Sequence, residues 1–276
     1  MQIPGLRVSD RGSVPTRVVA LAACVLMASA CSARRAPGTG AAGGAAGAPT
    51  PGALEATLVE RSEALASFQG QGKLAYDGPA GKLRSANMVV VRSPHDVRID
   101  FRSPFSLTYT VVCDGEQLIA YDRGEKVLYR GRPTSRNFGR YARVSVELHM
   151  LIALARGLPP IPRPATASSV HAVEGGWLWR IPSTTGGAVS IVLTRDSWLP
   201  TSARVDGRDD GNFVATFSDY EDVMGVPVAH KIRAELPDGA IVELSYGTVW
   251  RDRTHGDNAF QLEPPPGVRV VDMDAS

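Results

Sequence analysis

The sequence predicts a mainly β (α+β) fold, a large curved antiparallel sheet that forms a half-open barrel with helices covering its concave side. Three observations support this prediction. Segments of alternating apolar and polar residues recur along the chain, short turns rich in Gly, Asp and Pro separate them, and only two stretches have helical spacing. Strands joined by short turns are antiparallel neighbours, and a sheet of about ten to twelve strands curls.

The alternation is clearest at 96–103, where Val97, Ile99 and Phe101 alternate with charged residues. Further strands are predicted at 107–115, 117–122, 126–131, 176–182, 188–194, 212–220, 227–236 and 240–250.

Two helices are predicted. The first, 54–68, has Leu54, Leu58, Leu65 and Phe68 at helical spacing. The second interrupts the strands within "ARVSVELHMLIALARGLPPIP" (142–162) and ends at the stop signals Gly157 and Pro159. It is apolar nearly all round, so it either packs on the sheet as ordinary core or covers something apolar.

A sheet this wide can leave an interior that side chains do not fill, and an apolar interior holds an apolar ligand. Trp177 and Trp179 share one face and suit the mouth of such a cavity, because an indole has an apolar body and a polar tip. Ordinary core packing is the alternative for each candidate. The candidate cavity residues are Ile99, Phe101, Tyr109, Val111, Leu148, Leu151, Ile152, Trp177, Trp179, Ile191, Phe213 and Phe217.

The N-terminus resembles a secretory signal that ends in a lipidation site. Residues 1–30 combine a basic start with an apolar run too short to span a membrane. "ASAC" ends at Cys31 and "LAAC" ends at Cys24, and both resemble the lipobox of bacterial lipoproteins. Cys31 is preferred because a cut before Cys24 leaves too short an apolar core, and Cys24 remains the alternative.

The predicted domains are a signal peptide at 1–30, a lipidated cysteine with a flexible Gly/Ala/Pro linker at 31–53, and one folded domain at 54–276. Residues 1–30 hold three arginines and one aspartate, so their removal from 30 basic and 28 acidic residues leaves 27 of each. A net charge near zero gives no support for nucleic acid as a partner.

No catalytic or metal-binding pattern emerges from the sequence. The five histidines are scattered without metal-ligand spacing, and Asp209 and Asp210 sit in a turn that lacks the ligand ladder of an EF-hand. Cys113 precedes a turn with no histidine nearby and is expected to be an inert thiol. We therefore expect a protein that is not an enzyme and has no cofactor.

The order of segments over 54–272 resembles the outer-membrane lipoprotein-sorting proteins LolA and LolB. "FQGQGKLAYDG" resembles their first strand, and "RIDFRSPFSLTYTVVCDGEQLIAYD" resembles their strand, proline loop, strand and turn. "ARVSVELHMLIALARGLPP" resembles their interrupting helix. "FSDYEDVMGVPVAHKIRAEL" and "NAFQLEPPPGVRVVD" resemble their last strands and terminal segment. The lipobox makes the chain more similar to lipid-anchored LolB.

The resemblance implies a cavity for lipoprotein acyl chains beneath a helical lid, and delivery of that cargo to the outer membrane. An apolar residue of the proline loop helps insertion in that family, and the matching position is Phe105, although Ser106 stands where the family has glycine. The alternative for Phe105 is a turn residue folded back on the core. The implied location is the outer membrane, lipid-anchored and facing the periplasm. The implied partners are acyl chains of lipoproteins or lipids, the membrane surface and a soluble periplasmic carrier. A lipid sensor of envelope stress, or an assembly lipoprotein of the same fold, is the alternative.

Overall fold

The computed structural model describes residues 48–79, 81–103, 107–142, 144, 146–162, 167–183, 186–207 and 212–275. The predicted signal peptide, both candidate lipidation residues Cys31 and Cys24, and the loop residue Phe105 lie outside the described residues. Backbone contacts divide the chain into Met1–Ala42 and Gly43–Ser276, and all described residues belong to the second unit. The fold below is that of the second unit.

Fourteen strands form one sheet in the part of the chain that the structure describes. The first run of hairpins comprises β1 (Ser67–Gly78), β2 (Gly81–Arg92), β3 (Asp96–Arg102), β4 (Leu107–Asp114), β5 (Leu118–Asp122) and β6 (Val127–Gly131). The second run comprises β7 (Ser169–Val173), β8 (Gly176–Pro182), β9 (Gly187–Thr194), β10 (Pro200–Gly207), β11 (Phe213–Val223), β12 (Val226–Glu235) and β13 (Ile241–Arg251).

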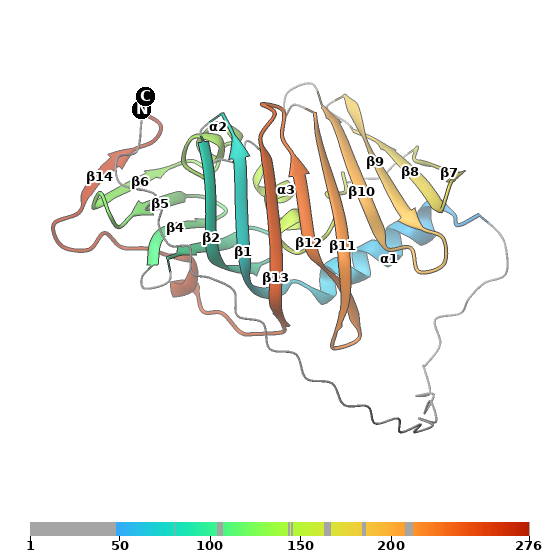
Figure 1. The fold of residues 1–276 in the computed structure, drawn as a ribbon, viewed down its shortest axis with the longest axis horizontal. Helices are drawn as coiled ribbons and strands as arrows, with labels where there is room; N and C mark the ends of the chain where they lie inside the picture. Colours follow the sequence, from blue (N-terminus) through green and yellow to red (C-terminus); the bar gives the residue numbers. More distant parts are fainter. Residues whose placement is uncertain are drawn as a thin grey trace, which may run out of the picture. The chain divides into compact units, whose positions relative to one another are not determined.

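The two runs meet where β1 pairs with β13, from Phe68 opposite Arg251 to Asp77 opposite Ile241. The last strand, β14 (Arg269–Asp272), pairs in parallel with β6, and all other pairings are antiparallel. The strand order is therefore β14-β6-β5-β4-β3-β2-β1-β13-β12-β11-β10-β9-β8-β7 (Figure 1). β14 and β7 are the two edges, so the curved sheet stays unclosed.

The predicted fold class is confirmed, and the strands predicted by alternation are present within a few residues. The expected ten to twelve strands become fourteen. Alternation does not reveal β2, β7, β10 and β14, and β1 was expected only from the family resemblance. β2 ends in the continuous apolar run Met88–Val91, since Val90 is covered on one face and Val89 and Val91 on the other. A run buried on both faces has no period of two.

Helix α1 (Pro51–Ala64) begins three residues before the predicted start and takes the last residues of the predicted linker. The Thr50 side chain caps it by accepting a hydrogen bond from the Ala53 amide, and Pro51 occupies the first turn, where its missing N–H costs nothing. The predicted end at Phe68 is wrong, because the helix stops at Ala64 and Phe68 is a buried residue of β1.

The second predicted helix is shorter than expected. It forms α3 (Leu148–Ala155), with Val144 outside the helix. Before it come α2 (Ser135–Asn137) and one π-helical turn, η1 (Phe138–Ala142), and a 3-10 turn, η2 (Asp257–Phe260), follows β13. Gly157 adopts a φ of +70° after α3, and the amides of Gly157 and Leu158 cap the Leu154 and Ala153 carbonyls.

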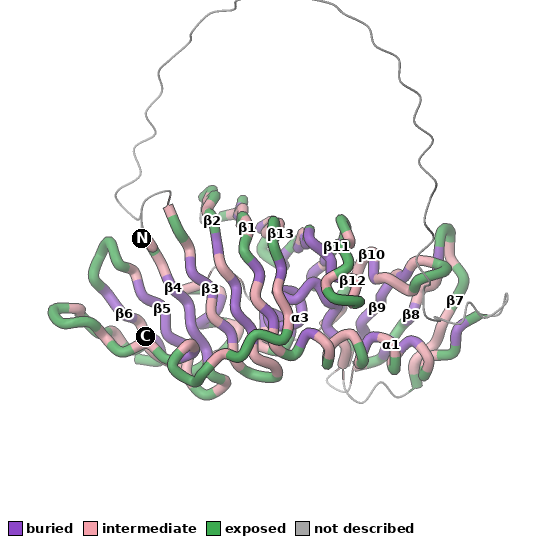
Figure 2. Tube along the Cα trace, turned by 90° about the horizontal axis from the view of Figure 1, so that it is seen from below, coloured by how far each residue is buried: buried purple, intermediate pink, exposed green. Residues whose placement is uncertain are grey.

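The main hydrophobic core lies between the inner face of the sheet and helices α1 and α3. Residues 150–155 of α3 are all buried, which fits a helix that is apolar nearly all round. Buried segments run through the middle of the strands, while the hairpin ends are exposed (Figure 2). Two smaller clusters lie on the outer face, where the C-terminal segment places Phe260 against Val90 and Val112, and Leu262 against Tyr121.

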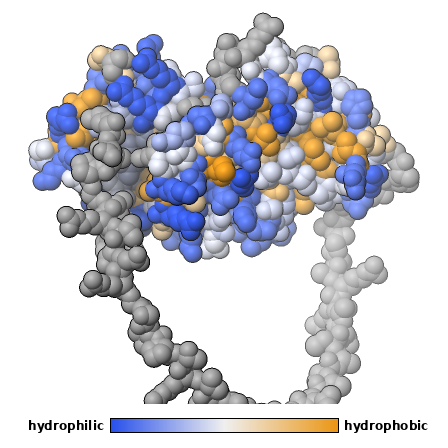
Figure 3. Space-filling model, turned by 45° about the horizontal axis from the view of Figure 1, so that its top comes forward, coloured by the Kyte–Doolittle hydropathy of each residue, from blue (hydrophilic) through white to orange (hydrophobic). Residues whose placement is uncertain are grey.

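The surface seen in Figure 3 is mixed, with hydrophobic residues in small groups between hydrophilic ones. Among the described residues, Met224 at the β11–β12 turn and Val270 on β14 are the exposed large hydrophobic side chains. The apolar character of the described chain is therefore concentrated on the inner side of the sheet.

Candidate functional site

Helix α3 is fixed to the sheet at its C-terminal end by Tyr246 of β13. The Tyr246 hydroxyl donates a hydrogen bond to the Ala155 carbonyl at 2.5 Å, and burial raises the pKa of this phenol well above its ordinary value. Gly70 of β1 leaves the space that the tyrosine ring occupies, since a Cβ there would lie 2.3 Å from Tyr246 Cε1. The ring also packs edge-on against Phe68, with centroids 5.4 Å apart.

The turn after α3 also needs close approach to the sheet. A Cβ on Gly157 would lie 2.9 Å from the Ala229 carbonyl oxygen on β12, and the left-handed φ of Gly157 already favours glycine. Glycine at this position therefore lets the backbone pass close to β12 before the proline-rich stretch 158–162.

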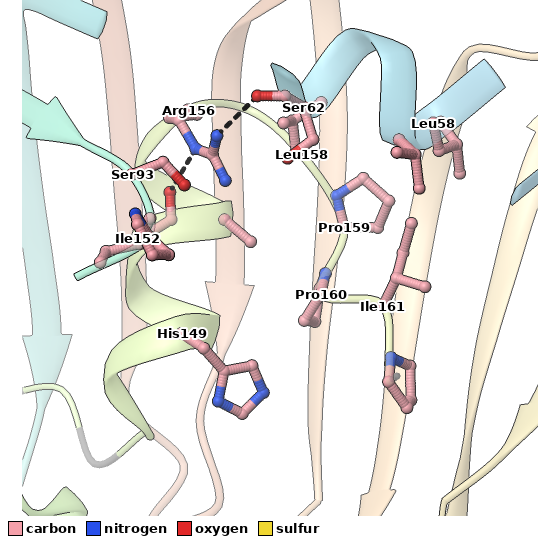
Figure 4. A pocket seen from close by; sticks show the side chains of 14 residues that line it. Leu58, Ser62, Ser93, His149, Ile152, Arg156, Leu158, Pro159, Pro160 and Ile161 are labelled. Atoms are coloured by element: carbon pink, nitrogen blue, oxygen red, sulfur yellow. Dashed lines mark hydrogen bonds between the residues drawn. The ribbon is translucent and has the colours of Figure 1, made fainter. Parts of the chain in front are cut away.

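Arg156 joins the C-terminal ends of the two helices (Figure 4). Its guanidinium is buried, with the residue 5% exposed, and Nη1 donates to the Ser62 carbonyl at 2.9 Å and the Leu65 carbonyl at 3.4 Å. Nε donates to the Ile152 carbonyl at 3.2 Å. A cation at two helix C-termini is favourable because their unpaired carbonyls carry partial negative charge. Arg156 therefore holds α1 against α3.

A second arginine fixes α1 to the other half of the sheet. Arg61 donates from Nη1 to the Trp198 carbonyl at 2.7 Å and from Nη2 to the Ser197 carbonyl at 2.8 Å, both in the β9–β10 turn. Burial lowers the pKa of Arg61 from its ordinary value. Both helices are thus held by charge-assisted hydrogen bonds as well as by apolar packing.

An open pocket of about 320 Å³ lies between α1, α3 and the stretch 158–162 (Figure 4). This volume is at the lower end of the range for small-molecule sites. His149 points into it beside Glu147, with its Nδ1 2.9 Å from the carboxylate. The lining is mostly apolar and consists of Leu58, Val59, Ser62, Ser93, Pro94, His149, Ile152, Ala153, Arg156, Leu158, Pro159, Pro160, Ile161 and Pro162.

Of the candidate cavity residues, Ile152 lines this pocket. The others except Trp177 pack with it in the core between the sheet and the helices. The buried ones are Ile99, Val111, Leu151, Trp179, Ile191, Phe213 and Phe217, and the partly buried ones are Phe101, Tyr109 and Leu148.

The two tryptophans of β8 differ in their surroundings. Trp179 is fully buried within the main core. Trp177 is partly exposed; its indole N–H donates to the Arg195 carbonyl at 3.2 Å, and the Arg195 guanidinium lies 5.4 Å from its ring centre. Trp177 therefore lies in a polar setting at the strand end.

Sequence reasoning did not single out Tyr246, Arg156 or the proline-rich lining of the pocket as site residues. One usable signal was the stretch "GLPPIP", because five residues without polar side chains follow the helix stop Gly157 there. No group of three or more His, Cys, Asp or Glu side chains in the described ranges is placed to hold a metal ion. None of the described helices has the length and apolarity needed to cross a membrane.

No family model matches the chain, and no curated protein sequence matches it. Several solved structures are similar to the chain. A DUF1329 family protein from Desulfovibrio piger has a TM-score of 0.56 and 14% identity, covering 75% of this chain and 94% of that one. A LolA superfamily protein from Nitrosomonas europaea has a TM-score of 0.53 and 12% identity, covering 76% and 97%.

The chain has a LolA-like fold. A third structure, a putative outer membrane lipoprotein-sorting protein domain from Vibrio parahaemolyticus, agrees, with a TM-score of 0.51, 13% identity and coverage of 75% and 94%. The open side of the sheet, with α1 and α3 across it and the pocket between them, is the candidate functional site.

Proposed function

We propose that this chain binds the acyl chains of lipoproteins or lipids between its curved sheet and the covering helices, and hands them to the outer membrane. The observation that carries the proposal is α3, a helix with six consecutive buried residues, 150–155, seated on the inner side of an open sheet beside an apolar pocket. The LolA-like fold supports the same function.

The pocket as it stands holds only part of a long chain. Its 320 Å³ is about ten times the volume of a water molecule in the liquid, about 30 Å³. A longer chain enters by displacing α3 and the 158–162 stretch, and its burial replaces the apolar contacts that α3 loses. Each buried methylene contributes about 0.8 kcal/mol, so handover to a bilayer needs neither nucleotide nor covalent chemistry.

Two further parts of the proposal concern residues outside the described ranges. Lipidation of Cys31, or of Cys24, anchors the chain to the outer membrane facing the periplasm, where a soluble carrier supplies the cargo. Phe105 in the β3–β4 loop contacts the membrane during delivery. Mass spectrometry of the mature N-terminus identifies the lipidated cysteine, and Phe105→Glu slows transfer to vesicles without weakening cargo binding.

Displacement of a fluorescent fatty acid tests the binding step. Ala153→Trp fills the pocket, because Ala153 is a buried lining residue of α3, and we expect at least a tenfold loss of probe affinity. Ala172→Trp makes the same change at an exposed position on β7 and leaves affinity unchanged. Failure of the unaltered protein to bind the probe, or to co-purify with lipid in native mass spectrometry, contradicts the proposal.

A further inference from the structure

Helix α3 and its C-cap residue form one wall of the pocket. His149, Ile152, Ala153 and Arg156 line the pocket at positions i, i+3, i+4 and i+7, which is the spacing of one helix face. At 1.5 Å per residue, His149 and Arg156 are roughly 10 Å apart along the helix axis. The wall therefore has an apolar middle, a histidine near the N-terminal end of α3 and a permanently charged arginine at the C-terminal end.

Two serines of the lining lie at the Arg156 end of the pocket. The Arg156 guanidinium donates to the Ser62 and Leu65 carbonyls. The amide of Ser93 donates to the carbonyl of the next residue, Ala66, at 2.7 Å. Ser62 and Ser93 therefore lie beside the guanidinium, and His149 lies toward the other end (Figure 4). Two hydroxyl groups and a cation at one place are suitable donors for a negatively charged oxygen.

The pocket lining carries positive charge. None of the described residues that line it is an Asp or a Glu, whereas Arg156 is a buried cation. Glu147, the carboxylate that pairs with His149, belongs to the opposite end of α3. An anion in an apolar site is unfavourable unless a cation meets it, and the planar guanidinium matches the geometry of carboxylate and phosphate groups. The lining therefore favours a ligand with an anionic head over one with an uncharged or cationic head.

The rest of the lining suits a hydrocarbon chain. Leu58 and Val59 of α1 and the stretch 158–162 face the apolar middle of the α3 wall across the pocket. The volume of about 320 Å³ is roughly that of ten water molecules, which leaves room for one chain. The side chain of His149 is 55% exposed, so the end of the pocket opposite Arg156 is open to solvent.

We propose that the pocket binds a single-chain amphiphile with an anionic head, a carboxylate or a phosphate, at Arg156, Ser62 and Ser93. The hydrocarbon chain then lies along the apolar wall of α3 toward the open end at His149. The proposal rests on the proposed function, because it specifies which acyl compound occupies the same pocket.

The test compares four competitors of ten-carbon length that differ in the head, namely decanoate, decyl phosphate, decanol and decyltrimethylammonium. Each displaces the uncharged dye N-phenyl-1-naphthylamine from the full-chain protein. In an apolar pocket without a cation, decanol would bind more tightly than either anion, because its head costs less to desolvate. We expect at least one of the two anions to bind about tenfold more tightly than decanol, and the cation to bind most weakly. The two anions, compared with each other, show which head the site takes.

Two variants locate the preference for an anion. Arg156→Met should reverse the order, so that decanol binds more tightly than both anions, whereas Arg156→Lys keeps the charge and should keep the order. Ser93→Ala should weaken binding of the preferred anion about threefold and leave decanol unchanged, and it serves as the test if the methionine variant does not fold. Arg84→Met makes the same change at an exposed position on β2 and should keep the preference.

Binding of decanol as tightly as the anions, or more tightly, by the unaltered protein overturns the inference and leaves the pocket as a site for uncharged acyl compounds. An unchanged preference in both Arg156→Met and Ser93→Ala overturns it as well, because the anion then binds elsewhere. Binding of neither the dye nor any competitor by the unaltered protein is a different result, since it rejects the proposed function and this inference with it.

Discussion

The Tyr246 hydroxyl on β13 donates its hydrogen bond to the carbonyl of Ala155, the last residue of α3. One phenol therefore connects the centre of the sheet to the helix that covers it, over a sequence separation of 91 residues. Because the bond is buried, its loss leaves the Ala155 carbonyl without this partner and frees the end of the helix.

Tyr246→Phe should lower the free energy of unfolding by about 1 to 2 kcal/mol, since it removes a buried hydrogen bond with little change in volume. Amide hydrogen exchange in α3 should accelerate more than exchange in the strands. Tyr121→Phe, at a buried tyrosine of the outer cluster, is the matched control. Uniform acceleration across the whole sheet would contradict a local role for Tyr246.

Gly70→Ala should lower the free energy of unfolding by about 1 to 3 kcal/mol, because the new methyl group overlaps the Tyr246 ring. The second change Tyr246→Leu should recover part of this loss by clearing the space. A double-mutant cycle on urea unfolding measures the coupling between the two sites. If the two changes have strictly additive effects on the free energy of unfolding, the strain caused by Gly70→Ala does not come from the Tyr246 ring.

Arg156→Met should lower the free energy of unfolding by about 2 to 4 kcal/mol, since it leaves the Ser62 and Leu65 carbonyls without their cationic donor. Hydrogen exchange in the last turn of α1 should rise together with that in α3. Arg84→Met makes the same change at an exposed position on β2 and should have little effect on stability. Unchanged exchange in α1 would show that Arg156 does not join the helices.

Burial raises the pKa of the Cys113 thiol from 9.0 to about 11. The folded state therefore holds this proton more firmly, and the associated stability is present below pH 9 and lost as the pH rises toward 11. The loss is at most about 1.4 kcal/mol per pH unit. Urea unfolding of the unaltered protein and Cys113→Ala between about pH 7 and pH 10.5 checks this. The variant should lose less stability with rising pH, and parallel pH curves would be inconsistent with the shift.

Asn87→Leu should raise the free energy of unfolding of the ligand-free protein by about 1 to 2 kcal/mol, because it removes an unpaired buried amide from the core. Asn137→Leu makes the same change at a buried asparagine with hydrogen bonds and should instead destabilise. Thermal unfolding of both variants measures the contrast. Destabilisation by both would indicate that Asn87 has a partner in solution.

Local sequence patterns were sufficient to predict most of the strands but few of the residues of the candidate site. Alternation identified strands such as β3, because Val97, Ile99 and Phe101 face the main core while charged residues occupy the other face. Alternation failed at β2, because Phe260, which belongs to the C-terminal segment after β13, covers Val90 on the outer face. No local pattern signals a cover that comes from the other end of the chain.

The candidate site depends even more than the fold on contacts between residues that are far apart in the sequence. Ile152 was identifiable as a candidate from the apolar character of its helix. The bonds from Arg156 to Ser62 and from Tyr246 to Ala155 join residues 94 and 91 positions apart, so a single sequence could not indicate them. The unpaired state of Asn87 also depends on register, because a shift of one residue would turn its side chain to the outer face.

The pairing of β1 with β13 has a consequence for how the molecule is made. On the β13 side of β1, Phe68 pairs with Arg251. A nascent chain therefore leaves this side of β1 without backbone partners until almost all of the chain has been synthesised. Connections between such remote segments slow folding and prolong the exposure of an unpaired edge. We therefore expect refolding to be slow and sensitive to protein concentration, and the nascent chain to need protection from aggregation.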